Sequence, residues 1–113
     1  MVKVYGIPNW QQIRKTRVVY DENNISYEFQ NLKKEPLEEN FLRDVVRQLG
    51  LDVVVNSKGM TYRKLGLKDK NLSEEDLIKV LLEEQGMIKR PLVENKERFQ
   101  IGFDEQKLLD FAK

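Results

Sequence analysis

Apolar residues recur along the chain with two different periods, which predict strands in some segments and helices in others. Residues 2–5 are short, β-branched and aromatic, which is typical of a strand. From residue 10 to residue 22, apolar residues recur at roughly helical spacing with basic residues between them, and the Asn-Asn pair at 23–24 ends this predicted helix. Residues 25–29 then alternate between apolar and polar, which is the period of a half-buried strand. The chain therefore opens with a predicted strand–helix–strand unit.

The middle of the chain, from about residue 36 to residue 88, is predicted to be a run of helices. Pro36 stands just outside a strong amphipathic stripe over residues 37–49, which ends at Gly50. Residues 51–55 are apolar and β-branched, and a run of this length fits either a strand or a helical turn. We favour a short helical piece inside the helical region.

Two further helices are predicted in this region. One covers residues 61–67 and is closed by Gly66. The other opens at residues 73–76, where Ser-Glu-Glu-Asp has the form of a capping box, and ends near Gly86. Its predicted buried side carries the apolar residues at 77, 78 and 80–82.

The last part of the chain predicts a hairpin followed by a helix. The first strand begins at Arg90-Pro91-Leu92-Val93, the turn lies within residues 94–97, and the second strand covers residues 99–103. A final helix is predicted over residues 104–112.

This order of elements is that of an α/β, thioredoxin-like fold: βαβ, a helical insert, then ββα, with a mixed four-stranded sheet. We expect residues 1–113 to form a single domain of this kind, with the helical insert at about residues 36–88.

Composition and charge exclude several classes of function. Lys and Arg number 20 against 19 Asp and Glu, and this net charge of +1 gives no overall attraction to nucleic acid or to an anionic membrane. No apolar run approaches the roughly 18 residues that a membrane span requires, and the first residues lack the apolar stretch of a signal peptide. We therefore expect a cytoplasmic protein that contacts no membrane.

Two residue types are absent, and their absence restricts the chemistry further. Without cysteine there is no disulfide, thiolate nucleophile or iron–sulfur ligand, and without histidine there is no imidazole base. The usual zinc sites are excluded for the same reason. We expect no metal site, no cofactor and no catalytic residue of the thiol or imidazole type.

Four short segments, taken in their order and spacing, resemble the arsenate reductase C (ArsC)/Spx family. They are residues 4–9 with 13–15, residues 56–65, residues 88–92 and residues 102–103. Within the family, the chain is more similar to the short reductase-like members than to Spx proper. The resemblance implies the same thioredoxin-like fold, and it implies a cis peptide bond between Arg90 and Pro91.

The resemblance fails at the position that carries the family's chemistry. Trp10 stands where the family has its nucleophilic cysteine, and Ile13 stands where the redox-pair members have a second cysteine. Of the three arginines that hold the oxyanion in arsenate reductases, only Arg90 carries over; Asn56 and Phe103 occupy the other two positions. An indole cannot ionise or attack a disulfide, so the isolated chain is not expected to reduce thiols or arsenate.

The anion-binding half of the family's site has two interpretations here. By resemblance, a helix N-terminus and one arginine would hold glutathione or an oxyanion. The residues of that candidate site are Asn9, Trp10, Gln11, Gln12, Ile13, Arg90 and Pro91. The interpretation that we favour is structural: Arg90 pairs with a carboxylate, and Asn9 only caps the helix. For Trp10, we expect partial exposure rather than complete burial as a plug.

Basic residues cluster on the first two predicted helices. They are Arg14, Lys15 and Arg17 on the first, and Arg43 and Arg47 on the second, with Lys58, Arg63 and Lys64 further along. A solvated face is the interpretation that we favour, and a surface for an acidic protein or for nucleic acid is the alternative. We expect no direct binding of nucleic acid.

Three functional hypotheses remain. The first, which we favour because the thiol is missing, is a non-catalytic adaptor or regulator of the Spx type; by resemblance its partner would be the C-terminal domain of the RNA polymerase α subunit. The second is a reductase-like protein that borrows a thiol from glutathione or a partner. The third is a module that binds a small anion or glutathione without chemistry. The sequence leaves the oligomeric state open.

Overall fold

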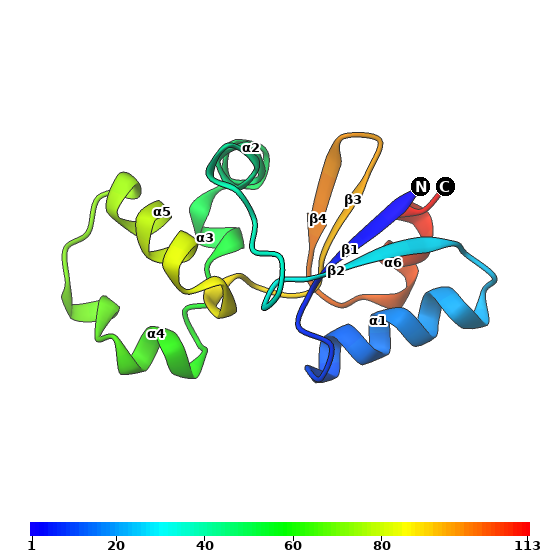
Figure 1. Ribbon diagram of the computed structural model, residues 1–113, viewed down its shortest axis with the longest axis horizontal. Helices are drawn as coiled ribbons and strands as arrows, with labels where there is room; N and C mark the ends of the chain where they lie inside the picture. Colours follow the sequence, from blue (N-terminus) through cyan, green and yellow to red (C-terminus); the bar gives the residue numbers. More distant parts are fainter. The chain divides into compact units, whose positions relative to one another are not determined.

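The computed structural model describes residues 1–113, which divide into two compact units (Figure 1). Unit 1 is built from residues 1–35 and 90–113, and unit 2 from residues 36–89. None of the helices is long and apolar enough to span a bilayer.

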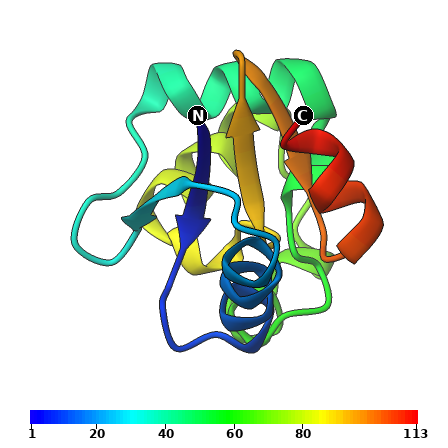
Figure 2. The ribbon, with the colours of Figure 1, turned by 90° about the vertical axis from the view of Figure 1, so that its right-hand side faces the viewer.

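Unit 1 contains the whole sheet, in the strand order β2-β1-β3-β4 (Figure 2). Strand β1 pairs parallel with β2 and antiparallel with β3, and β3 pairs antiparallel with β4. The mixed four-stranded sheet of the prediction is therefore confirmed. Its elements are β1 (Val2–Gly6), α1 (Gln11–Glu22), β2 (Tyr27–Asn31), β3 (Leu92–Asn95), β4 (Arg98–Ile101) and α6 (Glu105–Phe111).

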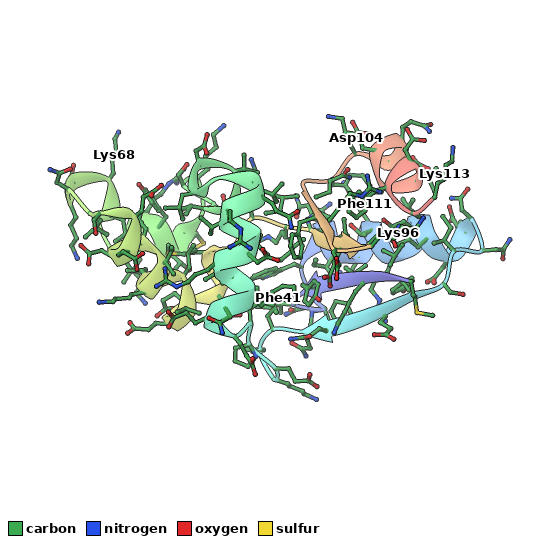
Figure 3. All side chains as sticks on the ribbon, turned by 90° about the horizontal axis from the view of Figure 1, so that it is seen from above. Phe41, Lys68, Lys96, Asp104, Phe111 and Lys113 are labelled. Atoms are coloured by element: carbon green, nitrogen blue, oxygen red, sulfur yellow. The ribbon has the colours of Figure 1, made fainter.

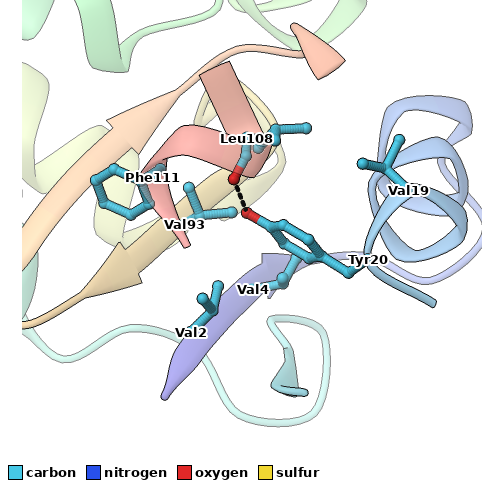
Figure 4. Packing of buried hydrophobic residues seen from close by; sticks show 7 residues of the cluster. All are labelled: Val2, Val4, Val19, Tyr20, Val93, Leu108 and Phe111. Atoms are coloured by element: carbon cyan, nitrogen blue, oxygen red, sulfur yellow. Dashed lines mark hydrogen bonds between the residues drawn. The ribbon is translucent and has the colours of Figure 1, made fainter. Parts of the chain in front are cut away.

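Helices α1 and α6 cover one face of this sheet. Val2 and Val4 point to that face from β1, because alternate residues of a strand share a side. They pack with Val93 and with residues of the two helices, all of them less than 10% exposed. Figure 4 shows the members of this cluster: Val2, Val4, Val19, Tyr20, Val93, Leu108 and Phe111.

Side chains from the rest of unit 1 hold the carbonyl groups at the end of α6. The Tyr20 hydroxyl donates to the Leu108 carbonyl at 3.0 Å (Figure 4), and the Asn95 amide donates to the Phe111 carbonyl at 2.8 Å. Both donors are buried. Burial raises the pKa of Tyr20 to about 12, so this phenol stays protonated at neutral pH. A short helix whose last carbonyls lack N–H partners gains most from such donors.

The other end of α6 and the hairpin are set by local sequence. Asp104, labelled in Figure 3, caps α6. Its carboxylate accepts from the Lys107 N–H at 3.0 Å. Lys96 and Glu97 connect β3 to β4 with φ angles of 53° and 65°, so both central residues of the turn are left-handed. Such two-residue turns match the twist of the paired strands. The turn predicted within residues 94–97 is confirmed, and it needs only the last two residues.

Unit 2 consists of helices alone, apart from one isolated bridge between Val55 and Ile88. The short helical piece predicted at residues 51–55 is confirmed as α3. The Ser73 hydroxyl accepts from the Asp76 N–H at 3.2 Å, which confirms the predicted cap of α5. The elements are α2 (Glu39–Leu49), α3 (Leu51–Val54), α4 (Met60–Lys64), η1 (Leu67–Asp69), α5 (Glu74–Glu83) and η2 (Gln85–Met87).

Several details differ from the expected pattern. Strand β2 covers Tyr27–Asn31 rather than residues 25–29, and β4 ends at Ile101 rather than at residue 103. The single helix predicted over residues 61–67 is two short pieces, α4 and η1, because Gly66 adopts a left-handed φ of 64° between them. Val18, one of the apolar residues that predicted α1, is 50% exposed. The face of α1 that packs on the sheet carries Ile13, Thr16, Val19 and Tyr20 instead.

Tyr20→Phe tests the capping of α6. Loss of the hydroxyl leaves the buried Leu108 carbonyl without its donor, so we expect the free energy of unfolding to fall by about 1–3 kcal/mol. Equilibrium unfolding in urea measures this value. Tyr27→Phe is the control, because Tyr27 is half-buried and its hydroxyl meets only the Arg17 guanidinium, at 3.2 Å. Equal losses in the two variants would contradict the assignment.

Candidate functional site

Helix α1 begins with Trp10 as its N-cap residue. Trp10 has φ −76° and ψ 140°, and its carbonyl accepts from the N–H groups of Ile13 and Arg14 at 3.1 and 3.0 Å. No side chain caps the helix. The prediction that Asn9 is the cap is therefore wrong. The Trp10 N–H donates to the Ile7 carbonyl at 3.1 Å, and this turn moves the start of the helix one residue along the chain.

The amides at the tip of α1 are only partly engaged. The N–H groups of Gln11 and Gln12 have no hydrogen-bond acceptor, whereas the Ile13 N–H is bonded to Trp10. No acidic residue occupies the first turn. Unbonded N–H groups and the helix dipole make such an end attractive to anions. Of the candidate residues Gln11, Gln12 and Ile13, the first two therefore have backbone N–H groups that could still bind an anion.

Ile13 anchors the tip of α1 against the end of β1. Its side chain is completely buried and lies over Gly6. A Cβ atom at Gly6 would stand 2.3 Å from Ile13 Cδ1, which is too close for any real contact. Glycine at this position therefore allows the helix to start directly beside the strand. Ile13 is a packing residue, and its side chain has no access to a ligand.

Arg90 stacks on the indole of Trp10, with 3.6 Å between the guanidinium carbon and the ring centroid. It forms no ion pair, so the prediction that it pairs with a carboxylate is wrong. Partial burial lowers the pKa of the Arg90 guanidinium, which nevertheless remains a cation at neutral pH. Trp10 is half-buried, which confirms the expected partial exposure.

The cis peptide bond predicted between Arg90 and Pro91 is confirmed. Pro91 is buried, and its carbonyl accepts from the Gly102 N–H at 3.1 Å. Asn9 is exposed, and its carbonyl accepts from the Arg14 guanidinium at 3.0 Å. The structure thus brings Trp10 and Arg90 into direct contact, and Gln11 and Gln12 follow Trp10 with their amides unbonded.

The two other positions that the resemblance assigns to family arginines are each described within their own unit. Asn56 belongs to unit 2, where its N–H donates to the Met87 carbonyl at 2.7 Å. Phe103 belongs to unit 1 and is 37% exposed, with the Lys15 ammonium 5.7 Å from its ring centroid. The contact between Lys15 and Phe103 was not predicted from the sequence, because no local pattern signals a contact between residues so far apart in the chain.

The site can bind, but it holds no group that can act as a redox nucleophile. A guanidinium and two unbonded amides attract anions, and an indole offers a flat apolar face. Neither an indole nor a guanidinium can exchange electrons with a disulfide or with arsenate.

Comparisons with known proteins agree with the fold. The family model "ArsC family" matches residues 5–111. The global transcriptional regulator Spx of Listeria innocua is 26% identical over 113 residues, which cover 98% of this chain and 86% of that protein.

Solved structures are similar over the whole length. A protein described as YffB shares 29% identity with a TM-score of 0.92, over all of both chains. A possible arsenate reductase from Streptococcus mutans shares 31% identity with a TM-score of 0.83, over 98% of each chain.

Restoring a thiol tests the electrostatics of the helix tip. In Trp10→Cys, the unbonded amides and Arg90 should stabilise the thiolate, so we expect the thiol pKa to fall below the ordinary value of about 8.5 by one unit or more. Thiolate absorbance followed against pH measures it. Val18→Cys is the matched control on the exposed part of the same helix: it lies beside Arg14 and Lys15 but away from the unbonded amides, so its thiol pKa should fall less than that of Trp10→Cys. Equal pKa values in the two variants would contradict the description of the tip.

Proposed function

Because the chain belongs to the ArsC family, we propose that it is a member that acts by binding and performs no thiol chemistry of its own. The observation that carries the proposal is the stack of Arg90 on Trp10, at the helix tip where this family has its cysteine. The predicted single-domain organisation of residues 1–113, with the helical insert at about 36–88, is part of the proposal. No cofactor is required for this activity.

The side chains of this chain do not suit the reduction of a disulfide or of arsenate. Reduction of a disulfide or of arsenate needs a nucleophile that can form and then break a covalent bond to sulfur or arsenic. The chain has no cysteine and no histidine, so neither a thiolate nor an imidazole-activated hydroxyl is available. A reductase activity would therefore require a thiol supplied by glutathione or by another protein.

A protein is the ligand that we favour. Trp10 is half-buried and already desolvated on one face by Arg90, and both Trp and Arg are enriched among the residues that contribute most to protein–protein binding. The similarity to Spx, a global transcriptional regulator, supports a role as an adaptor or regulator. The partner that we propose to test first is the C-terminal domain of the RNA polymerase α subunit, with no direct contact to nucleic acid.

A small anion or glutathione is the second candidate, and a specific observation favours it. Arg90 has no carboxylate partner, and the amides of Gln11 and Gln12 have no acceptor. An oxyanion or a glutathione carboxylate placed there would accept from all three. Charge-assisted hydrogen bonds of this type are roughly twice as strong as neutral ones.

The first test is direct binding to the purified α C-terminal domain. We expect a complex at tens of micromolar, measured by calorimetry, and at least tenfold weaker binding by Trp10→Ala because a desolvated aromatic anchor is lost. Met60→Ala is the control, since Met60 is an exposed apolar residue, at 86%, that the proposed binding does not use. No heat of binding at these concentrations would remove this partner from the proposal.

The second test uses the fluorescence of Trp10, the single tryptophan of the chain. Glutathione, phosphate or arsenate bound to Arg90 should change the stacking on the indole, and hence its emission. We expect a saturable change at millimolar ligand that Arg90→Ala abolishes. Arg47→Ala serves as the control, because Arg47 pairs with Asp44 in unit 2. An emission spectrum that stays constant for all three ligands would rule out the second candidate.

A further inference from the structure

We propose that the outer face of α1 recognises an acidic segment of a partner protein, an inference that rests on the proposed function and names the chemistry of the partner. This surface, the basic face, consists of Arg14, Lys15 and Val18 of α1 together with Phe103. It begins one turn after Trp10, so it continues the surface on which the proposed binding depends.

The basic face is continuous by helix geometry and by contact. Arg14 and Val18 are four residues apart on α1, and Lys15 and Val18 are three apart, so the three side chains are neighbours. Lys15 reaches the ring of Phe103, at 5.7 Å from the ammonium to the ring centroid. Val18 is 50% exposed and Phe103 37% exposed. Apolar surface is thus accessible between two cations.

The cations of the basic face have no carboxylate partner. The ion pairs of the structure involve Arg43, Arg47 and Lys113. Arg43 bonds Glu39 and Glu75, and those two carboxylates neutralise it. By contrast, Arg14 bonds only a backbone carbonyl. Of the basic residues that the sequence grouped together, only Arg43 and Arg47 have a carboxylate partner. Arg14 and Lys15 of the basic face are among those that have none.

The charge order along α1 opposes its dipole. Helices are stabilised by acidic residues in the first turn and basic residues in the last, each by roughly 0.3–1 kcal/mol. Helix α1 has no acid in its first turn and no base in its last, while Asp21 and Glu22 lie at its C-terminal end. This order concentrates positive potential on the first half of the helix. It lowers the stability of the helix and favours an acidic ligand.

The extent of the positive surface suits a short peptide better than a nucleic acid. Asp21 and Glu22 border the basic face at one end, and Asp104 and Glu105 follow Phe103 directly. Between Gln11 and Val18 the helix rises only about 10 Å, at about 1.5 Å per residue. A nucleic-acid strand would carry its phosphates past these carboxylates, whereas a few acidic and apolar residues would not extend so far.

The test measures binding of a labelled peptide of about 12 alternating glutamate and leucine residues by fluorescence anisotropy. Its counterpart with glutamine in place of glutamate reports binding that does not depend on charge. We expect the acidic peptide to bind at least tenfold more tightly than the counterpart, and to bind several-fold more weakly when salt is raised from about 50 to about 300 mM.

The decisive variant is Arg14→Glu/Lys15→Glu, for which we expect at least a tenfold loss of peptide affinity. Both side chains are exposed, so this variant should unfold in urea at a concentration close to that of the wild type. Lys33→Glu/Lys34→Glu is the matched control: both lysines are exposed, and either double variant changes the net charge by −4, from +1 to −3. The control should keep its affinity within about twofold.

Three outcomes would overturn the inference. They are equal affinity for the acidic and neutral peptides, an equal loss in both double variants, and tighter binding of a twelve-nucleotide oligothymidylate with the same variant dependence. If any of these occurs while the α C-terminal domain or glutathione still binds in the preceding tests, the proposed function stands and only the basic face is wrong. If those tests fail and the acidic peptide binds as expected, the surface is correct and the named ligands are wrong.

Discussion

The arrangement of unit 1 depends on the contact between Ile13 and Gly6. Because Gly6 has no side chain, Ile13 can be buried directly over the end of β1, and this contact holds the first turn of α1 against the strand. Trp10, the N-cap, and the unbonded amides of Gln11 and Gln12 directly precede Ile13 and are placed with it. A larger residue at position 6 would displace the tip of the helix, and with it the group on which Arg90 stacks.

A cysteine at the helix tip would combine an electropositive environment with a reactive group, whereas this site has only the electropositive environment. The electrostatic part, a helix tip without acidic residues and an unpaired guanidinium, is present. The reactive part is absent, because the indole of Trp10 can neither ionise nor form a bond to sulfur. Arg90 lies against that indole rather than against a carboxylate. An electropositive surface with an aromatic centre is what remains, and it is suited to recognition.

Much of the fold could be predicted from the sequence, because each strand and the strongest helices carry their own period. The Ser73 cap depends on neighbouring residues and was predicted correctly. The strand expected at residues 25–29 and the turn expected within residues 94–97 exist, but their bounds are Tyr27–Asn31 and Lys96-Glu97. The start of α1 was wrong by one residue, since a turn that closes at Ile7 outweighs the capping tendency of Asn9.

The candidate site was harder to predict, because its partners are distant in the chain. Arg90 was expected to meet a carboxylate, but the nearest group is an indole from the other end of the sequence. Arg43 finds an acidic partner 32 residues away in Glu75, whereas Lys15 finds an aromatic ring. The sequence alone does not distinguish Arg90, Arg43 and Lys15, because each is simply a basic residue. Only packing distinguishes a neutralised cation from one that is available to a ligand.

The two donors that complete α6 have a consequence for the order in which the unit forms. A helix of seven residues is too short to persist by itself, and its terminal carbonyls depend on Tyr20 from α1 and Asn95 from β3. The C-terminal helix therefore becomes stable only after both of those elements have assembled. Its amide hydrogens should therefore exchange with solvent at least as fast as those of the strands on which it depends.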